Sequence, residues 1–352
     1  MKRMRTLAGI SILALVLAAC SSGTTDTAAE ETAAGLDDSN CAAAENFCVG
    51  LVTDIGKVDD KTFNQSAHEG ATAAAAEVGG FYKYIETTDS KDYAANLKQF
   101  TDKSYDVIVT VGFMLGEATA VAAKENPNSK FIGVDQFQAE EVANLTGLIF
   151  PEDQAGYAAG YLAGLMTKTN KLGQVLGGEI PPVQKFAKGF EAGALKANPA
   201  VKVTTVYHAS DGKEFTDPVW GAAEAKKQLA QGADIIFGAG GGTGNGALGE
   251  IAKAEGAGTS IFCIGVDLDQ WNTVPEARPC LVTSAMKGLV EGTSDLVKAA
   301  FDGSIKGGNF LGTTGLADYH DLASAVSADI QSEVAKVVAG LKDGSVKTGV
   351  TL

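Results

Sequence analysis

The sequence predicts an α/β protein built as two lobes, each a doubly wound parallel sheet. Short apolar runs alternate with Ala-rich amphipathic runs along most of the chain, and this alternation breaks and restarts around residues 145–151. Alternating strands and helices are typical of parallel βαβ units. The chain has 352 residues, 43 of them Gly, and a chain this long usually forms two cores rather than one.

The first series of elements begins near residue 47 with an apolar strand that leads into Asp54. The following strands are short runs of Val, Ile, Phe and Tyr, and the helices repeat apolar residues at helical spacing. The expected strands are 48–53, 81–85, 105–110 and 130–134, and the expected helices are 63–78, 93–103 and 117–124.

The second series begins after the break with a helix rich in Ala and Gly, and ends with a helix in the C-terminal tail. The same alternation predicts a second parallel sheet. The expected strands are 171–176, 201–207, 233–237, 260–266 and 281–285, and the expected helices are 154–167, 183–197, 217–231, 244–254, 289–302 and 324–341.

Two such series imply a chain that crosses between lobes more than once, near 145–151 and again near 280–285. We therefore assign 46–148 and 284–318 to lobe 1, and 149–283 and 319–352 to lobe 2. Ligands of doubly wound sheets bind beyond the carboxyl ends of the strands. A hinge between two lobes can close around such a ligand.

The N-terminus predicts export and lipid attachment. Lys2, Arg3 and Arg5 precede an apolar stretch over 7–19, and Leu17-Ala-Ala-Cys20 resembles a bacterial lipobox. We expect 1–19 to be a signal peptide and Cys20 to carry several fatty acyl chains, because one chain binds membranes only marginally. An ordinary secretory signal is the alternative. Residues 20–45 have few large apolar side chains and are expected to be a flexible tether on the extracytoplasmic face of the cell membrane.

The charge of the chain excludes some partners. The net charge is −15, and removal of three basic residues with the signal leaves about −18 by subtraction. A strongly acidic protein repels nucleic acid and anionic lipid headgroups. We therefore expect no nucleic-acid partner, and a ligand that is neutral or cationic.

Four further cysteines, Cys41, Cys48, Cys263 and Cys280, favour disulfides in an exported chain. Three connectivities are possible, and local pairing of Cys41 with Cys48 and of Cys263 with Cys280 is the simplest. Four buried free thiols are the alternative. A metal site is not expected, because the three histidines are scattered and no Cys-x-x-Cys occurs.

Acidic residues follow three of the expected strands: Asp54, Asp135 and Asp267. If the strands form, these carboxylates face the cleft, where they can accept hydrogen bonds from paired sugar hydroxyls. The alternative for each is that it caps the following turn or helix. Lys287 ends a further strand and either pairs with Asp267, binds a ligand hydroxyl, or reaches the surface.

Phe63 and Asn64 open the first expected helix. An aromatic face beside a donor–acceptor amide suits a flat heterocycle, which stacks and forms hydrogen bonds at its edge. The alternative is that Asn64 or Thr62 is a plain N-cap and that Phe63 belongs to the core.

The densest glycine run, 238–246, follows a strand and opens a helix. Gly242-Thr-Gly244-Asn-Gly-Ala247 matches a loose dinucleotide fingerprint, which is the best case for an NAD enzyme. A closer fit is a backbone that approaches a small ligand and donates N–H groups from the start of a helix. No Walker lysine follows, and no nucleophile–base set appears. We expect no cofactor and no enzymatic activity.

These residues together resemble the basic membrane protein (BMP) or PnrA-like family, the substrate-binding lipoproteins of ABC transporters. The matching segments span nearly the whole mature chain in the order of the family. They are Val49-Gly-Leu-Val-Thr-Asp54, Asp59-Asp-Lys-Thr-Phe-Asn-Gln65, Glu69-Gly70, Gly147-Leu-Ile-Phe150, Gly156-Tyr-Ala-Ala-Gly-Tyr-Leu-Ala-Gly164, Asp217-Pro218, Ala239-Gly-Gly-Gly-Thr-Gly244, Gly265-Val-Asp-Leu-Asp-Gln270 and Thr283-Ser-Ala-Met-Lys287.

The resemblance implies a type I periplasmic-binding-protein fold, with two Rossmann-like lobes, a hinge and an interlobe cleft. It also implies a purine-nucleoside ligand and ABC permease subunits as partners. In the family, residues matching Asp54, Phe63 and Asn64 contact the base.

The remaining implied contacts come from other segments. A second aromatic residue stacks on the opposite face of the base, and Phe215 is its best match. Asp267 and Lys287 match the residues that hold the ribose, with help from the glycine loop near Gly242, and Asp135 matches another contact.

The chain also departs from the family pattern. Trp220 competes with Phe215 for the stacking position, and Phe113 and Met114 are further candidates for the base pocket. Base preference stays open. A sugar or autoinducer receptor on the same fold is the alternative function, and a nucleoside hydrolase is a weaker one.

Overall fold

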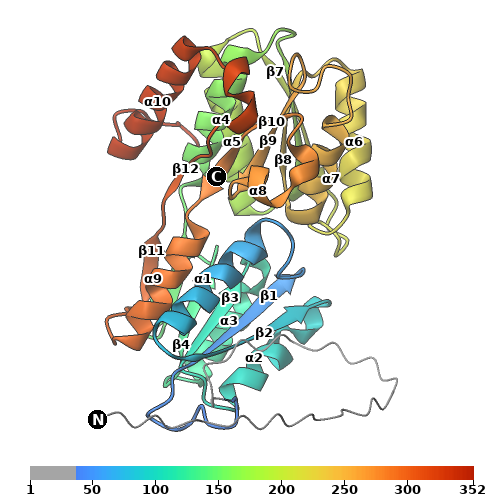
Figure 1. Cartoon of the computed structure of the whole chain (residues 1–352). Helices are drawn as coiled ribbons and strands as arrows, with labels where there is room; N and C mark the ends of the chain where they lie inside the picture. The colour runs from blue at the N-terminus through green and yellow to red at the C-terminus, as the bar shows by residue number, and fades with distance from the viewer. Residues whose placement is uncertain (1–36) are drawn as a thin grey trace, which may run out of the picture.

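The computed structural model describes residues 37–352, which form two lobes stacked end to end (Figure 1). The predicted signal peptide, the predicted lipidation site Cys20 and most of the predicted tether lie outside the described residues. Each lobe contains a six-stranded sheet. Among the described residues, no helix is long and apolar enough to cross a membrane.

The sheet of lobe 1 has the order β11-β5-β4-β3-β1-β2, and all of its pairings are parallel. Lobe 1 also contains the helices that cover this sheet. The strands are β1 (Cys48–Ile55), β2 (Phe81–Thr87), β3 (Val107–Val111), β4 (Lys130–Val134), β5 (Leu145–Ile149) and β11 (Gly308–Leu311), and the helices are α1 (Phe63–Glu77), α2 (Tyr93–Thr101), α3 (Gly116–Glu125) and α9 (Leu289–Phe301).

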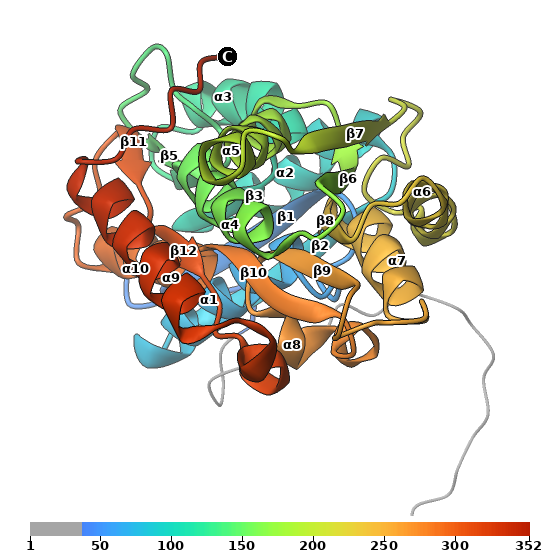
Figure 2. The ribbon, with the colours of Figure 1, turned by 90° about the horizontal axis from the view of Figure 1, so that it is seen from above.

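The sheet of lobe 2 has the order β12-β10-β9-β8-β6-β7. Only β12 runs antiparallel to its neighbour. Helices cover both faces, with α4 and α5 on one side and α7 and α8 on the other (Figure 2). The strands are β6 (Lys171–Gly178), β7 (Lys202–His208), β8 (Ile235–Ala239), β9 (Phe262–Asp267), β10 (Leu281–Lys287) and β12 (Thr314–Leu316), and the helices are α4 (Glu152–Met166), α5 (Pro181–Ala197), α6 (Pro218–Ala230), α7 (Gly241–Ile251), α8 (Gln270–Thr273) and α10 (Ala328–Asp343).

Short 3₁₀ helices complete the connections between these elements. They are η1 (Ser90–Asp92), η2 (Phe113–Leu115), η3 (Pro275–Ala277) and η4 (His320–Ala325).

The chain crosses between the sheets three times: after β5, after β10 and between β11 and β12. All of β10, including Lys287, pairs with β9 and therefore belongs to the sheet of lobe 2. The second crossing thus lies at residue 288 rather than at 283–284. The third lies at 312–313 rather than at 318–319, because β12 also pairs with β10.

Close helix packing explains the small residues of α4. An added Cβ at Gly160 would lie 1.9 Å from the carbonyl oxygen of Phe190 on α5, and one at Gly156 would lie 2.2 Å from that of Phe186. Only Gly permits such an approach of two backbones. This packing places α5, and with it Phe186, against the start of α4 and the lobe 2 side of the cleft.

Both predicted disulfides form, Cys41–Cys48 and Cys263–Cys280. The first attaches residues 37–45 to lobe 1, although the sequence predicted that these residues belong to the tether. Asp38 there accepts hydrogen bonds from Lys83, at 2.9 Å, and from Lys103. This segment is therefore part of the folded lobe.

Candidate ligand-binding site between the lobes

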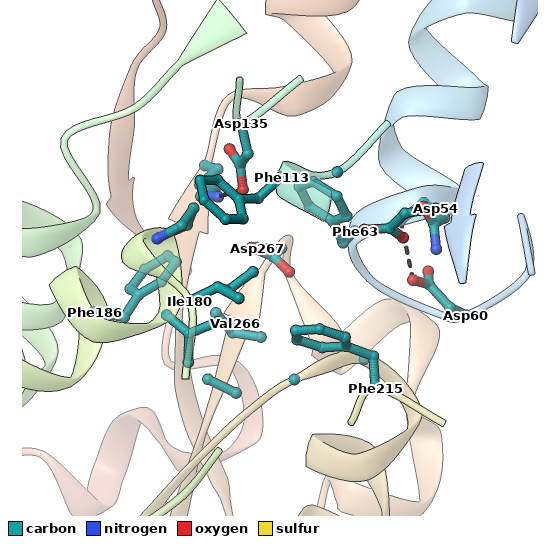
Figure 3. A pocket seen from close by; sticks show the side chains of 18 of the residues that line it. Asp54, Asp60, Phe63, Phe113, Asp135, Ile180, Phe186, Phe215, Val266 and Asp267 are labelled. Atoms are coloured by element: carbon teal, nitrogen blue, oxygen red, sulfur yellow. Dashed lines mark hydrogen bonds and ion pairs between the residues drawn. The ribbon is translucent and has the colours of Figure 1, made fainter. Parts of the chain in front are cut away.

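A pocket lies between the lobes, at the carboxyl ends of the strands, and side chains from both lobes point into it (Figure 3). Seven of the eight predicted ligand contacts line it. They are Asp54, Phe63, Asn64, Asp135, Phe215, Asp267 and Lys287. The structure thus brings together residues that are more than 200 positions apart in the sequence.

Gly242, the eighth predicted contact, lies in the first turn of α7 and does not line the pocket. The residues before it, Gly240 and Gly241, do so instead. Both have positive φ angles, 150° and 55°, and an added Cβ at Gly240 would lie 2.3 Å from the backbone N of Gly177. The part of the glycine run that lines the pocket therefore lies one to two residues before Gly242.

The structure shows which of the aromatic candidates line the pocket. Phe63 lies at the start of α1 in lobe 1, and Phe215 lies in the loop after β7 in lobe 2, on the other side of the pocket (Figure 3). Phe113 also lines the pocket, whereas Met114 does not. Trp220 packs against His208, with ring centroids 4.6 Å apart, outside the pocket. Of the two candidates for the second stacking residue, Phe215 therefore lines the pocket and Trp220 does not.

One end of the pocket is formed by Asp54 and Asp60. Asp54 lies so close to Gly112 that an added Cβ there would be 1.8 Å from its Oδ2. Asp60 accepts hydrogen bonds from the backbone N–H groups of Thr62, Asn64 and Gln65, at 3.0–3.1 Å. It thereby caps α1 and orients the two residues, Phe63 and Asn64, that enter the pocket.

Burial governs the acidity of these two carboxyls. It raises the pKa of Asp54 well above its usual range, and the neighbouring carboxylates, Asp60 first, add to the effect. Burial also raises the pKa of Asp60 to about 6, against the lowering effect of the three N–H donors. A raised pKa favours the protonated carboxyl, so this end of the pocket can both donate a hydrogen bond to a ligand and accept one from it.

Lys287 forms the other end of the pocket. Its Nζ lies 2.6 Å from Oδ2 of Asp135 in lobe 1 and 3.3 Å from Oε1 of Glu152 in lobe 2. The rings of Phe63, Phe150 and Phe186 lie 5.2–5.5 Å from the same atom, within the range of cation–π attraction.

Asp267 was one expected partner of Lys287, but its carboxylate forms a hydrogen bond with a different residue. Its Oδ2 accepts a hydrogen bond from Oγ1 of Thr62 at 2.6 Å. The direct partners of Lys287 are instead Asp135 and Glu152, as described above.

Three buried carboxyls share the charge of one lysine. Burial raises the pKa values of Asp135, Asp267 and Glu152, and the ammonium of Lys287 opposes that rise. Burial disfavours the charge of Lys287, but the three carboxylates outweigh it and raise its pKa above its ordinary value. The ammonium of Lys287 is therefore already surrounded by three carboxyls, and this arrangement disfavours an anionic ligand.

Glu152 was not predicted as a site residue. It is 1% exposed, and its Oε2 also binds Lys185 at 3.2 Å. As the first residue of α4 after Pro151, it looks in the sequence like an ordinary acidic residue of a first helical turn. Only the packing of α4 against α5 and β10 shows that it is buried.

Two residues that line the pocket each have a buried oxygen that accepts no hydrogen bond from the described residues: Oδ1 of Asn64 and Oδ1 of Asp135. Both are buried. Figure 3 shows Asp54 and Asp135 on opposite sides of the Phe63 ring, and Asn64 is adjacent to Phe63 in the chain. Buried acceptors are nearly always paired, so each is suited to a donor on a bound molecule.

The backbone at two of the strand-terminal aspartates is left-handed, with φ 60° at Asp135 and 68° at Asp267. Such angles are uncommon outside Gly and are most accessible to Asn and Asp. They cluster at binding sites, where the surrounding structure maintains them. No group of His, Cys, Asp and Glu among residues 37–352 is arranged to hold a metal ion.

The family described as ABC transporter substrate-binding protein PnrA-like matches residues 47–318, which covers both lobes and every residue of the pocket. The chain belongs to this family. It is similar to the CD4+ T-cell-stimulating antigen of Listeria monocytogenes, with 32% identity over 87% of this chain and 88% of that protein. It is also similar to the ABC transporter nucleoside-binding protein BmpA of Lactococcus lactis, with 29% identity over 84% and 87% of the two chains.

Solved structures agree on the architecture. A solute-binding protein of an ABC transporter system from Aeropyrum pernix covers 86% of this chain and 92% of its own, with 23% identity and a TM-score of 0.77. This PnrA-like chain therefore has the two-lobed fold of periplasmic solute-binding proteins, as the sequence predicted.

The acidic pocket of this PnrA-like protein predicts a stability that falls as pH rises. The pKa of Asp60 is raised in the fold, so its contribution to stability is full below pH 3.8 and is lost as pH rises through about 6. We expect roughly 1–3 kcal/mol from this group. Urea denaturation between pH 4 and 7 measures it: Asp60→Asn should flatten the slope, whereas exposed Asp295→Asn should not. Equal slopes in all three proteins would contradict the assignment.

Proposed function

We propose that this chain captures a purine nucleoside in the interlobe pocket and delivers it to the permease of an ABC importer. The observation that supports the proposal most is the pair of unpartnered acceptors, Asn64 Oδ1 and Asp135 Oδ1, with the Phe63 ring between the two ends of the pocket (Figure 3). A ligand that fits has a flat ring in the middle and donors at both ends.

A nucleoside has this distribution of groups. Its base stacks between Phe63 and Phe215, and the base edge forms hydrogen bonds with Asp54 and Asn64. Each aromatic contact is worth about 0.5–1.5 kcal/mol beyond the area that it buries. The ribose hydroxyls donate to Asp135 and Asp267. The similarity to the nucleoside-binding protein BmpA of Lactococcus lactis supports the same class of ligand.

Charge supports a neutral nucleoside over a nucleotide. Asp54, Asp60, Asp135 and Asp267 all line the pocket, and among residues 37–352 Lys287 is the one cation that lines it. A phosphate placed there would be surrounded mainly by carboxyl oxygens, and every ionised carboxyl would repel it in a region of low dielectric. We therefore propose that nucleotides are rejected. We also propose that the chain acts as a binding protein and not as an enzyme, so that the ligand is released unchanged.

Lipid attachment at Cys20 is part of the proposal, and its support is the lipobox-like sequence Leu17-Ala-Ala-Cys20. In this arrangement the folded lobes lie outside the cytoplasm at the cell membrane, close to the permease. The mass of the mature protein extracted from membranes tests the anchor: a mass without acyl chains contradicts it.

Calorimetry tests the ligand. We expect adenosine, guanosine or inosine to bind, and the corresponding 5′-monophosphate and free ribose to bind at least about 100-fold more weakly, which corresponds to about 2.7 kcal/mol. Ribose binding without nucleoside binding would favour the sugar-receptor alternative. Free base and ribose recovered from the calorimeter cell after the titration would favour a hydrolase. No heat with any nucleoside would refute the proposed ligand while leaving the fold unaffected.

A further inference from the structure

Three consecutive residues of lobe 1 form hydrogen bonds to lobe 2. Asn245 Nδ2 on α7 donates to the carbonyl oxygen of Asp60 at 2.9 Å, and Thr273 Oγ1 on α8 donates to that of Lys61 at 2.8 Å. Thr62 Oγ1 donates to Asp267, as described above. We call these three bonds the closure latch. In Figure 1, α7 and α8 lie at the edge of lobe 2 that faces lobe 1.

The lobe 2 side of the latch is prearranged. Oδ1 of Asn245 accepts a hydrogen bond from Nε2 of Gln270 at 2.7 Å. Oε1 of Gln270 in turn accepts one from the backbone N–H of Val266, at 2.8 Å, on the strand that carries Asp267. Gln270 is fully buried. The amide of Asn245 is thereby oriented so that its N–H points across the cleft.

The lobe 1 side is equally rigid. The side chain of Asp60 caps α1, so the latch residues 60–62 and the start of α1 form one unit. Lys61 has a left-handed φ of 66°, which forms the tight turn between the two latch carbonyls. Phe63 and Asn64 follow at once in the chain. A contact that holds the latch therefore also holds these two side chains in the pocket.

We propose that Asn245 and Thr273 are positioning residues that keep the lobes closed around a bound ligand and so set its dissociation rate without touching it. Neither residue lines the pocket. The inference rests on the proposed function, because it concerns the ligand of that pocket. A ligand enters the open form, and opening the lobes breaks the latch bonds, so the latch mainly slows release. The free protein is also closed part of the time, and this lowers the association rate only by its closed fraction.

The sharpest test is Asn245→Asp. This change keeps the oxygen that Gln270 binds, and replaces the donor to the Asp60 carbonyl with an oxygen that repels it. Stopped-flow fluorescence with 2-aminopurine riboside, chased with excess guanosine, should show dissociation about tenfold faster, the size of one net hydrogen bond, with an association rate within about twofold of wild type. Thr273→Val, which preserves shape, should give about a threefold increase.

Asn198→Asp is the matched control. Its Nδ2 donates to Asn170 within lobe 2, and its Oδ1 accepts from Ala200, so the same substitution alters no interlobe bond. An unchanged dissociation rate in Asn245→Asp, or an equal change in Asn198→Asp, overturns the latch.

Failure of the wild type to bind any nucleoside would refute the proposed function instead. In that case, small-angle X-ray scattering of the ligand-free proteins tests whether the latch holds the lobes together. A larger radius of gyration in Asn245→Asp than in wild type and Asn198→Asp supports it, and equal radii overturn it.

Discussion

The variant Lys287→Met should lose nucleoside binding and about 3–5 kcal/mol of folding stability at pH 7.5. The change leaves the buried Asp135 without the ammonium at 2.6 Å, and it leaves the buried Glu152 with Lys185 as its remaining ion-pair partner. Removing one partner of a buried ion pair costs about this much because the other charge stays desolvated. Met fills a similar volume and keeps the contact with the three surrounding phenylalanine rings, so packing contributes little to the loss.

The loss of folding stability in Lys287→Met should be smaller at acidic pH. Without the ammonium, the pKa values of the buried carboxyls rise further above their values in the unfolded chain. Stability from such groups is full below the unfolded pKa and falls as pH rises. Urea denaturation of wild type and Lys287→Met at pH 4.5 and 7.5 measures the difference at each pH, and the difference should be clearly smaller at pH 4.5.

Lys185→Met is the control for Lys287→Met. Lys185 binds the other oxygen of Glu152, but its side chain is 36% exposed, and a pair that reaches solvent is worth less than about 1 kcal/mol. Equal losses in the two variants, or a loss in Lys287→Met that does not depend on pH, would contradict the buried-charge explanation.

The strands that end at the cleft were predictable because their sequences carry the signal locally. Each is a buried apolar run, and the aspartate after it must lie at the carboxyl edge of the sheet; this is why Asp54, Asp135 and Asp267 were found. Strands β11 and β12 were missed because they are short and not fully buried. Their pairing depends on the neighbouring strand and not on a pattern of their own.

The missed site residues share one cause, which is that long-range packing decides their burial. Glu152 resembles a surface residue until α5 and β10 enclose it, and Asp60 resembles a plain helix cap, which it also is. The resemblance of the sequence to the PnrA-like family located the glycine run, but only the φ angles of Gly240 and Gly241 show which residues approach the pocket. The ion-pair partners of Lys287 likewise depend on distances that are set only when the chain folds.

The variant Asp267→Asn should weaken nucleoside binding by about 100-fold or more while the protein without ligand unfolds as the wild type does. Asn tolerates the left-handed φ of 68° at this position, and its Oδ1 can still accept the hydrogen bond from Thr62. The substitution also removes one of the three carboxyls that share Lys287. The reduced repulsion among the carboxyls offsets any contact that is lost. Stability should therefore stay within about 1 kcal/mol of wild type.

Nucleoside binding should weaken although stability does not, because the proposed role of Asp267 is to accept hydrogen bonds from the ribose hydroxyls. A hydrogen bond to a charged acceptor is worth about 1.5–3 kcal/mol, and the amide of Asn presents a donor where the hydroxyl also donates. Calorimetry with a nucleoside and its 2′,3′-dideoxy analogue isolates this contact. Wild type should discriminate strongly between the two, and Asp267→Asn should bind both weakly and almost equally. Persistent discrimination in the variant would place the ribose elsewhere, and an unfolded variant would make Asp267 a structural residue.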